Sequence, residues 1–265
     1  MTLHKHKLRF ALPTVLIVVL LVAGACRTPQ PARESNAKAE SSPQQTVLLD
    51  QIFDKYTEAV GGREAVERIK TYTLEGAFEM RGRDLTLPVK IYVKKPDKSL
   101  MEIDVPRVGT IRRGTSDGKS WSQTPLTGIR QDAPNELTEL ERDHDIYLAG
   151  GIKNLYQSVR LESKARLNGR DVYIVEGKPR EGPAEKMLFD QETGLLLRWD
   201  IVRRQPNRPN VFARIYLDDY REIGGVKVPF TIKYFVEPRE LILRLNDVEH
   251  NVELGDAMFA APAAR

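Results

Sequence analysis

The chain has 265 residues, a formal net charge of +4 and a single cysteine. Three of its lysines and arginines, and none of its acids, lie in residues 1–25, so removal of that segment would leave a net charge of +1. Such a small charge gives little support for a nucleic-acid partner. One cysteine excludes an intrachain disulfide, so the folded part must be stabilised by its core alone.

Residues 1–25 have the pattern of a secretory signal peptide. Lysines and an arginine in residues 5–9 precede an almost uninterrupted apolar stretch at residues 10–22, and small residues follow at 23–25. The apolar stretch is short for a membrane-spanning helix. We therefore expect this segment to direct export and to be removed.

Cys26 follows the small residues directly, in a pattern that resembles the bacterial lipobox, although Ala23 stands where a large aliphatic residue is more usual. The resemblance implies that Cys26 is lipidated and becomes the mature N-terminus. Arg27, a residue other than Asp after the anchor, then implies the outer membrane. The alternative is an ordinary cleaved signal that leaves a free thiol.

Residues 26–46 are expected to form the anchor and a flexible tether, since residues 27–46 are rich in Pro, Ser, Gln and Ala and lack large apolar side chains. A coil of this length would span roughly 25 Å. The folded domain is predicted at residues 47–265. It begins with an amphipathic helix at 47–60, which is ended by Gly61 and Gly62, and a short helical stretch at 63–70.

Residues 71–123 predict five β-strands, because apolar and polar residues alternate along them and turn residues separate them. Residues 125–157 interrupt this pattern with a predicted helix at 135–148, which either plugs the sheet or covers its concave face. Seven more strands are expected near residues 158–167, 170–177, 185–190, 195–203, 211–220, 227–237 and 240–250.

About twelve strands in one antiparallel sheet predict a curved structure, because a twisted sheet of more than about ten strands tends to curl or split. The expected fold is mainly β, of the α+β class. The large curved antiparallel sheet forms an incomplete barrel, and helices cover its concave face.

A set of apolar side chains is predicted to line that face, either as an acyl-binding site or as a core packed under the helices. Its members alternate along the predicted strands or lie on the 135–148 helix: Phe78, Ile91, Ile103, Trp121, Leu137, Leu140, Tyr147, Leu188, Leu197, Trp199, Tyr216, Phe230, Tyr234 and Leu243.

No residue pattern predicts catalysis, a cofactor or a metal. The run of Asp143, His144 and Asp145 lies on the predicted helix, where adjacent side chains cannot converge on one ion. His250 has no second histidine at ligand spacing. Asp218 and Asp219 are successive strand residues and so face opposite sides of the sheet.

Several local patterns together resemble the LolA/LolB lipoprotein-carrier superfamily over residues 47–260. They are the first helix and the segment after it at 52–70, the Gly-Lys-Ser-Trp segment at 118–121, the Asp-x-x-Thr-Gly-Leu hairpin at 190–195, and the segments 216–220 and 225–230. The resemblance implies a half-barrel whose apolar cavity takes up acyl chains, and it implies binding without catalytic residues.

Three hypotheses follow. The first is a lipid-anchored protein, facing the periplasm, that binds acyl chains of lipoproteins or lipids and hands them on in sorting at the outer membrane, together with a periplasmic carrier or envelope protein. The second is an envelope sensor or scaffold of the same fold that binds a protein partner. The third is a cell-envelope hydrolase, which would lose turnover when Asp219 is changed to Asn.

Overall fold

The computed structural model describes residues 43–262 except 133–151, 181, 206–207 and 238, and the compact unit that contains them runs from Ser41 to Arg265. No helix in this described part has the length and apolar character needed to cross a membrane. The predicted helix at 135–148 lies outside the described residues.

Thirteen strands form one antiparallel sheet in the order β6-β5-β4-β3-β2-β1-β13-β12-β11-β10-β9-β8-β7. Each strand pairs with its neighbour in sequence, except that β1 pairs with β13 and that β6 and β7 form the two edges. The strands are β1 (Thr71–Met80), β2 (Thr86–Lys94), β3 (Lys98–Val105), β4 (Gly109–Ser116), β5 (Lys119–Thr124), β6 (Gly128–Gln131), β7 (Tyr156–Leu167), β8 (Arg170–Pro179), β9 (Glu185–Asp190), β10 (Leu196–Gln205), β11 (Arg208–Ile223), β12 (Val226–Val236) and β13 (Arg239–His250).

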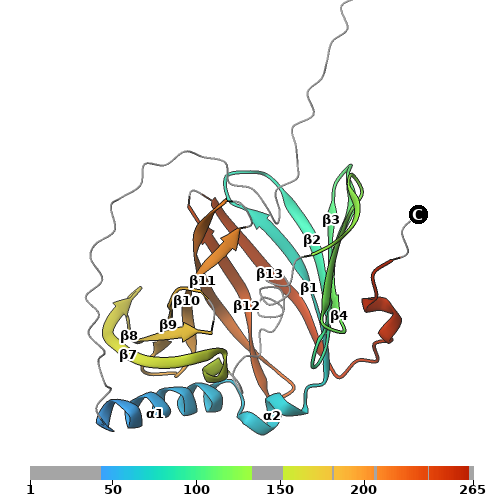
Figure 1. Cartoon of the computed structure of the whole chain (residues 1–265). Helices are drawn as coiled ribbons and strands as arrows, with labels where there is room; N and C mark the ends of the chain where they lie inside the picture. The colour runs from blue at the N-terminus through green and yellow to red at the C-terminus, as the bar shows by residue number, and fades with distance from the viewer. Residues whose placement is uncertain (1–42, 133–151, 181, 206–207, 238, 263–265) are drawn as a thin grey trace, which may run out of the picture. The chain divides into compact units, whose positions relative to one another are not determined.

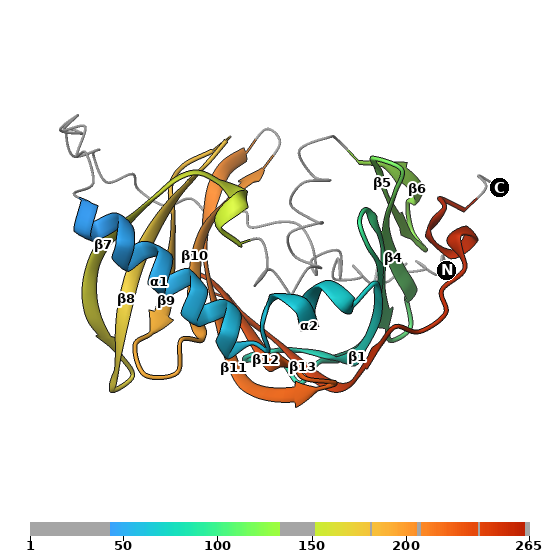
Figure 2. The same cartoon turned by 90° about the horizontal axis from the view of Figure 1, so that it is seen from below.

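The sheet curves into an incomplete barrel, as Figure 2 shows, and this confirms the predicted fold class. Register shifts in β7, β10 and β13 interrupt regular pairing, and such bulges bend strands and increase their twist. Opposite the shift in β13, the position of a Cβ on Gly76 would lie 2.1 Å from the carbonyl oxygen of Arg244. Glycine therefore permits a close approach of β1 and β13, the pair that joins the two halves of the sheet.

Helices α1 (Pro43–Ala59) and α2 (Arg63–Arg68) lie at one end of the strands (Figures 1 and 2). Phe53 and Tyr56 of α1 pack against Phe189 of β9, with ring centroids 5.6 and 5.4 Å apart. The helix begins four residues before the predicted start at residue 47, and proline is well tolerated in the first helical turn. A short 3₁₀ helix, η2 (Ile152–Leu155), directly precedes β7.

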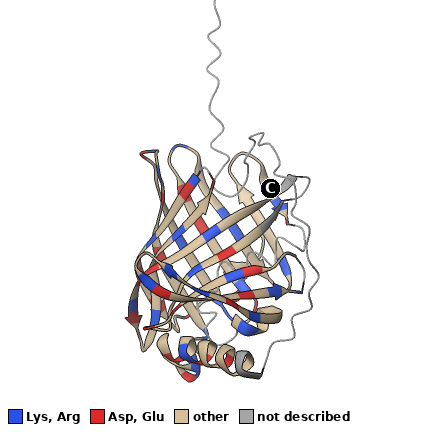
Figure 3. Cartoon of the chain, turned by 90° about the vertical axis from the view of Figure 1, so that its left-hand side faces the viewer, with Lys and Arg blue, Asp and Glu red and all other residues tan. Residues whose placement is uncertain are grey.

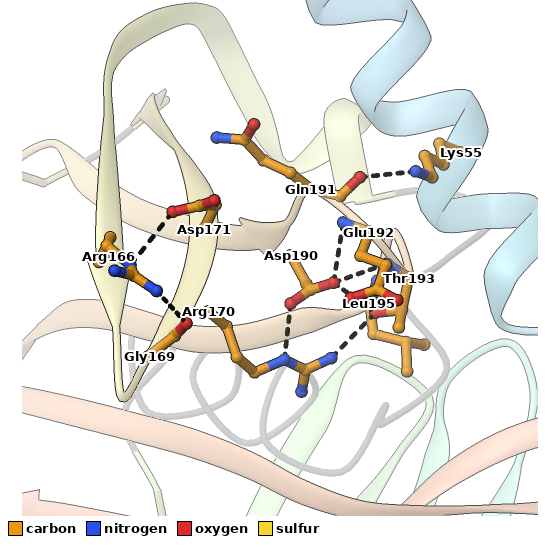
Figure 4. Close-up of polar contacts among 10 residues, drawn as sticks. All are labelled: Lys55, Arg166, Gly169, Arg170, Asp171, Asp190, Gln191, Glu192, Thr193 and Leu195. Atoms are coloured by element: carbon orange, nitrogen blue, oxygen red, sulfur yellow. Dashed lines mark hydrogen bonds and ion pairs between the residues drawn. The ribbon is translucent and has the colours of Figure 1, made fainter.

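The Asp190–Leu195 turn connects β9 to β10 and holds α1 in place (Figure 4). Asp190 Oδ1 accepts hydrogen bonds from the backbone N–H of Glu192 and from both the backbone N–H and the hydroxyl of Thr193, and Asp190 Oδ2 lies 2.7 Å from Arg170 Nε. Lys55 of α1 donates to the Gln191 carbonyl oxygen at 2.7 Å. The Asp-x-x-Thr-Gly pattern thus forms a turn that is stabilised by its own hydrogen bonds and that accepts a hydrogen bond from Lys55 of α1.

Candidate ligand-binding face

One face of the sheet carries a continuous apolar surface, which we call the inner face. Residues paired across antiparallel strands point to the same side, and the pairs Ile232–Leu243, Leu243–Phe78 and Phe78–Leu87 run from β12 to β2. The apolar surface continues across β9 to β11 through Met187, Trp199 and Ile215, and across β2 and β3 through Val89, Ile91, Met101 and Ile103.

The inner face is the concave one. Phe189, which contacts α1, lies two residues from Met187 on β9 and therefore points to the same side. Figure 2 shows α1 and α2 across one open end of the curve, and η3 (Asp256–Phe259) on the opposite side of β3 and β4. The sequence-predicted half-barrel therefore has an apolar interior.

The outer face carries charged side chains. Ion pairs bridge neighbouring strands there, for example Lys90–Glu75 at 2.5 Å and Arg160–Glu176 at 2.8 Å. Figure 3 shows basic and acidic residues interspersed along the strands. The alternation of apolar and charged residues thus separates an apolar inner face from an outer face that carries the charged side chains.

The structure brings together on the inner face seven of the fourteen predicted lining residues. Tyr234 is half-buried and the other six are buried: Phe78, Ile91, Ile103, Trp199, Phe230 and Leu243. Leu137, Leu140 and Tyr147, like the Asp143–Asp145 run, lie outside the described residues. Leu197 lies at the register shift between Leu196 and Arg198.

Leu188 and Tyr216 do not belong to this face. Both pair with Arg198, whose guanidinium lies 5.7 Å from the centre of the Tyr216 ring, and Tyr216 also pairs with Lys233. They therefore point to the outer side of β9 and β11. The alternation in the sequence assigned both residues to the wrong face. Apolar residues occupy successive positions in both strands, so either set of alternate residues could face inward.

Trp121 also lies on the outer face. It pairs with Gly114, packs against Leu100 and Phe259, and donates a hydrogen bond from Nε1 to the Phe259 carbonyl oxygen at 2.9 Å. A Cβ on Gly114 would lie 2.6 Å from the indole ring, so the ring occupies the space that a larger residue would need. The prediction failed because the cover of Trp121 comes from residues 251–262, more than a hundred positions away.

Two buried polar groups on the inner face were not predicted. Glu185, 4% exposed, accepts hydrogen bonds from Tyr156 Oη at 2.8 Å and from Trp199 Nε1 at 3.1 Å. At the other end of the sheet, Arg113 and Asp132 lie beside serine side chains of β5. Glu185 could have been predicted to lie on this face, because it alternates with the apolar Met187 and Phe189 along the same strand.

Each of the two candidate acids contacts a basic side chain. Asp219 pairs with Arg221 at 2.6 Å, and hydrogen bonding from that guanidinium lowers the pKa of Asp219, while Asp218 lies 3.4 Å from Lys233 Nζ. Burial and then the charge of Lys95 lower the pKa of His250. Within the described ranges, no group of three or more His, Cys, Asp or Glu residues is placed to hold a metal ion.

Comparison with known proteins gives a structural likeness only. Neither a protein-family model nor a curated protein matches the chain. Among solved structures, a DUF1329 family protein from Desulfovibrio piger has a TM-score of 0.58 at 18% identity and covers 80% of this chain and 96% of its own. An outer membrane lipoprotein-sorting protein domain from Vibrio parahaemolyticus has a TM-score of 0.57 at 11% identity, covering 79% and 94%.

A LolA superfamily protein from Nitrosomonas europaea has a TM-score of 0.55 at 13% identity and covers 80% of this chain and 97% of its own. Each of these structures is matched over nearly its whole length. The half-barrel with an apolar inner face is therefore a LolA-like fold.

Proposed function

We propose that the protein binds acyl chains of lipoproteins or lipids on its inner face and takes part in lipid or lipoprotein sorting in the bacterial envelope. The observation that carries this proposal is the continuous apolar surface on the concave side of a curved, unclosed sheet. Two of the structurally similar proteins are described as a lipoprotein-sorting domain and a LolA superfamily member, which supports the same class of cargo.

Burial of hydrocarbon supplies the binding energy. Each methylene removed from water contributes about 0.8 kcal/mol, so about ten methylenes would contribute about 8 kcal/mol before the costs of ordering. Few polar contacts are needed for such a ligand. Binding of this kind requires no catalytic residue and no cofactor.

The N-terminal segment supports the proposed location at the bacterial envelope. A signal at residues 1–25, lipidation of Cys26 and a tether up to the start of α1 would hold the half-barrel near a membrane, and Arg27 favours the outer membrane. Stable attachment needs more than one acyl chain, because a single chain binds a membrane only marginally.

The test is binding by the chain from residue 26 onward with Cys26→Ser, which cannot be lipidated. Organic extraction of the purified protein followed by mass spectrometry should release acyl lipid, and a fluorescent fatty acid should bind to the delipidated protein. An empty protein that does not bind the fatty acid, and that captures an envelope protein instead, would support the scaffold hypothesis and contradict the proposal.

Two tyrosines provide a matched pair of variants. Tyr234 lies on the inner face of β12 and Tyr216 on the outer face of β11, and both are half-buried. Tyr234→Ala should weaken fatty-acid binding about tenfold, since it removes an aromatic contact with the chain. Tyr216→Ala should leave the affinity within about twofold; equal losses would show that the inner face is not the binding surface.

A further inference from the structure

The inner face changes from apolar to polar along part of the β3–β4 pair; Ile111 on β4 pairs with Ile103 and continues the apolar surface, but the next two pairs do not. Met101 on β3 pairs with Arg113 on β4, which pairs in turn with Ser122 on β5. In the adjacent set of cross-strand pairs, Ser99 on β3 pairs with Thr115 on β4, which pairs in turn with Ser120 on β5. Asp132, which directly follows β6, donates from its backbone N–H to the Ser120 carbonyl oxygen at 2.9 Å.

We call Arg113, Ser120, Ser122 and Asp132 the polar corner. It is well buried: the Asp132 side chain is 0% exposed, the Arg113 side chain 12%, and Ser120 as a whole 3%. Because the polar corner adjoins Met101 on the same face, a ligand whose hydrocarbon lies along β1 to β3 would bring its polar end to this place.

The polar corner is only partly bonded internally. Asp132 Oδ1 accepts from Ser122 Oγ at 3.0 Å and pairs with Arg130 at 2.7 Å. Asp132 Oδ2 lies 3.6 Å from the nearest Arg113 nitrogen, beyond hydrogen-bond reach. In the described structure, Arg113 Nε, Ser120 Oγ and Asp132 Oδ2 are buried without a hydrogen-bond partner.

Unpartnered buried polar atoms are uncommon, because each costs the free energy of its lost hydration. Three of them around one corner of a proposed ligand-binding face point to a polar group of the ligand. Their chemistry also restricts that group: Arg113 Nε can only donate, Asp132 Oδ2 can only accept, and the Ser120 hydroxyl can do both.

We propose that the polar corner binds the head group of an acylated ligand, and that this head group carries neighbouring hydroxyls of the glycerol or sugar type. The inference rests on the proposed acyl-binding function. Hydroxyls accept from Arg113 and donate to Asp132, so a diol satisfies all three atoms. An anionic head group would place its charge beside Asp132 Oδ2, which can only accept. Arg113 and Arg130 together against Asp132 leave a formal charge of +1 at this place, so the test includes an anionic ligand.

The test compares three ligands with the same hydrocarbon chain, using the chain from residue 26 onward with Cys26→Ser and isothermal titration calorimetry. The ligands are 1-monomyristoylglycerol, methyl myristate and sodium myristate. Monomyristoylglycerol should bind at least about tenfold more tightly than methyl myristate, as expected from additional hydrogen bonds, two of them to the charged groups of Arg113 and Asp132.

Arg113→Met should lower the affinity for monomyristoylglycerol about 10- to 100-fold and leave that for methyl myristate within about twofold. The matched control is Arg112→Met, on the same strand but on the outer face, where Arg112 pairs with Glu102 at 2.7 Å. Arg112→Met should change neither affinity by more than about twofold.

Ser120→Ala separates ligand binding from a structural role. Removing a buried hydroxyl that lacks a partner should not lower the Tm of the ligand-free protein, yet it should weaken monomyristoylglycerol binding about 2- to 10-fold. A lowered Tm with unchanged discrimination between the two esters would make Ser120 structural and overturn its assigned role.

Three further results would overturn the inference. Equal binding of monomyristoylglycerol and methyl myristate would remove the head-group site but leave acyl binding intact. Tighter binding of myristate, with dependence on Arg113 for myristate alone, would replace the diol with an anion. Failure of all three ligands to bind would overturn the proposed function together with this inference.

Discussion

The two tryptophans of the chain are both buried, but on opposite faces of the sheet. Trp121, on the outer face, is covered by Phe259 and bonded to a backbone carbonyl of the C-terminal segment. Trp199, on the inner face, donates to the buried carboxylate of Glu185. Burial alone therefore does not identify a binding surface; the two tryptophans differ in that a distant segment of the chain, residues 251–262, packs on Trp121.

The largest effect is expected when the cover of Trp121 is removed. Phe259 is fully buried, and Phe259→Ala should lower the free energy of unfolding by about 3–5 kcal/mol. Denaturant unfolding followed by tryptophan fluorescence measures this loss. Phe259→Leu, which keeps most of the apolar volume, should cost less, and fatty-acid affinity should be unchanged in both variants while they remain folded.

An unfolding energy that barely changes in Phe259→Ala would contradict the role given to residues 251–262 on the outer face. A large loss of fatty-acid affinity in the folded variant would do so as well, because it would connect the outer face to ligand binding.

A smaller effect is expected around Trp199. Glu185→Ala removes the acceptor of Tyr156 Oη and Trp199 Nε1 and should lower the free energy of unfolding by about 2–3 kcal/mol, because two buried donors lose their partner. Glu185→Gln keeps an acceptor oxygen and should cost less. Equal stability of Glu185→Ala and the parent protein would mean that this buried carboxylate does not support the inner face.

The smallest effect concerns the pH dependence of the C-terminal segment. Hydrogen bonds from Lys94 and then Lys98 lower the pKa of Asp256 to about 2. A carboxyl whose pKa is lower in the folded protein stabilises the fold above its unfolded pKa near 3.9, and this contribution is lost as the pH falls toward 2. Asp256 is exposed, so the change is small.

Asp256→Asn should abolish this part of the pH dependence. Thermal unfolding between pH 5 and pH 2 is the measurement, and the curves of the two proteins should converge at the acid end. A constant difference in Tm across that range would show that the ion pairs with Lys94 and Lys98 contribute no pH-dependent stability.

The sequence predicts the sheet well because a period of two is a local property of each strand. It predicted the hairpins between Thr71 and His250 and the two N-terminal helical stretches. It missed β6, which has only four residues, and the first turn of α1, whose Pro43 lies in a polar and proline-rich segment.

The choice of face was harder to predict. In β9, Met187, Leu188 and Phe189 are all apolar, and apolar residues also flank Tyr216 on both sides, so both phases of the alternation look alike. Long-range contacts decide the face of Trp121. The polar corner could not be predicted from the sequence for the same reason, since Arg113 and Asp132 come together only when β4, β5 and β6 pair.

The two tryptophans can report whether hydrocarbon binds on the inner face. Trp121→Phe leaves Trp199 as the reporter of the inner face, and Trp199→Phe leaves Trp121 as the reporter of the outer face. A fatty acid brominated in mid-chain quenches indole fluorescence only at close range. We expect strong quenching in Trp121→Phe and little in Trp199→Phe; equal quenching in both, or quenching of Trp121 alone, would show that hydrocarbon does not bind on the inner face.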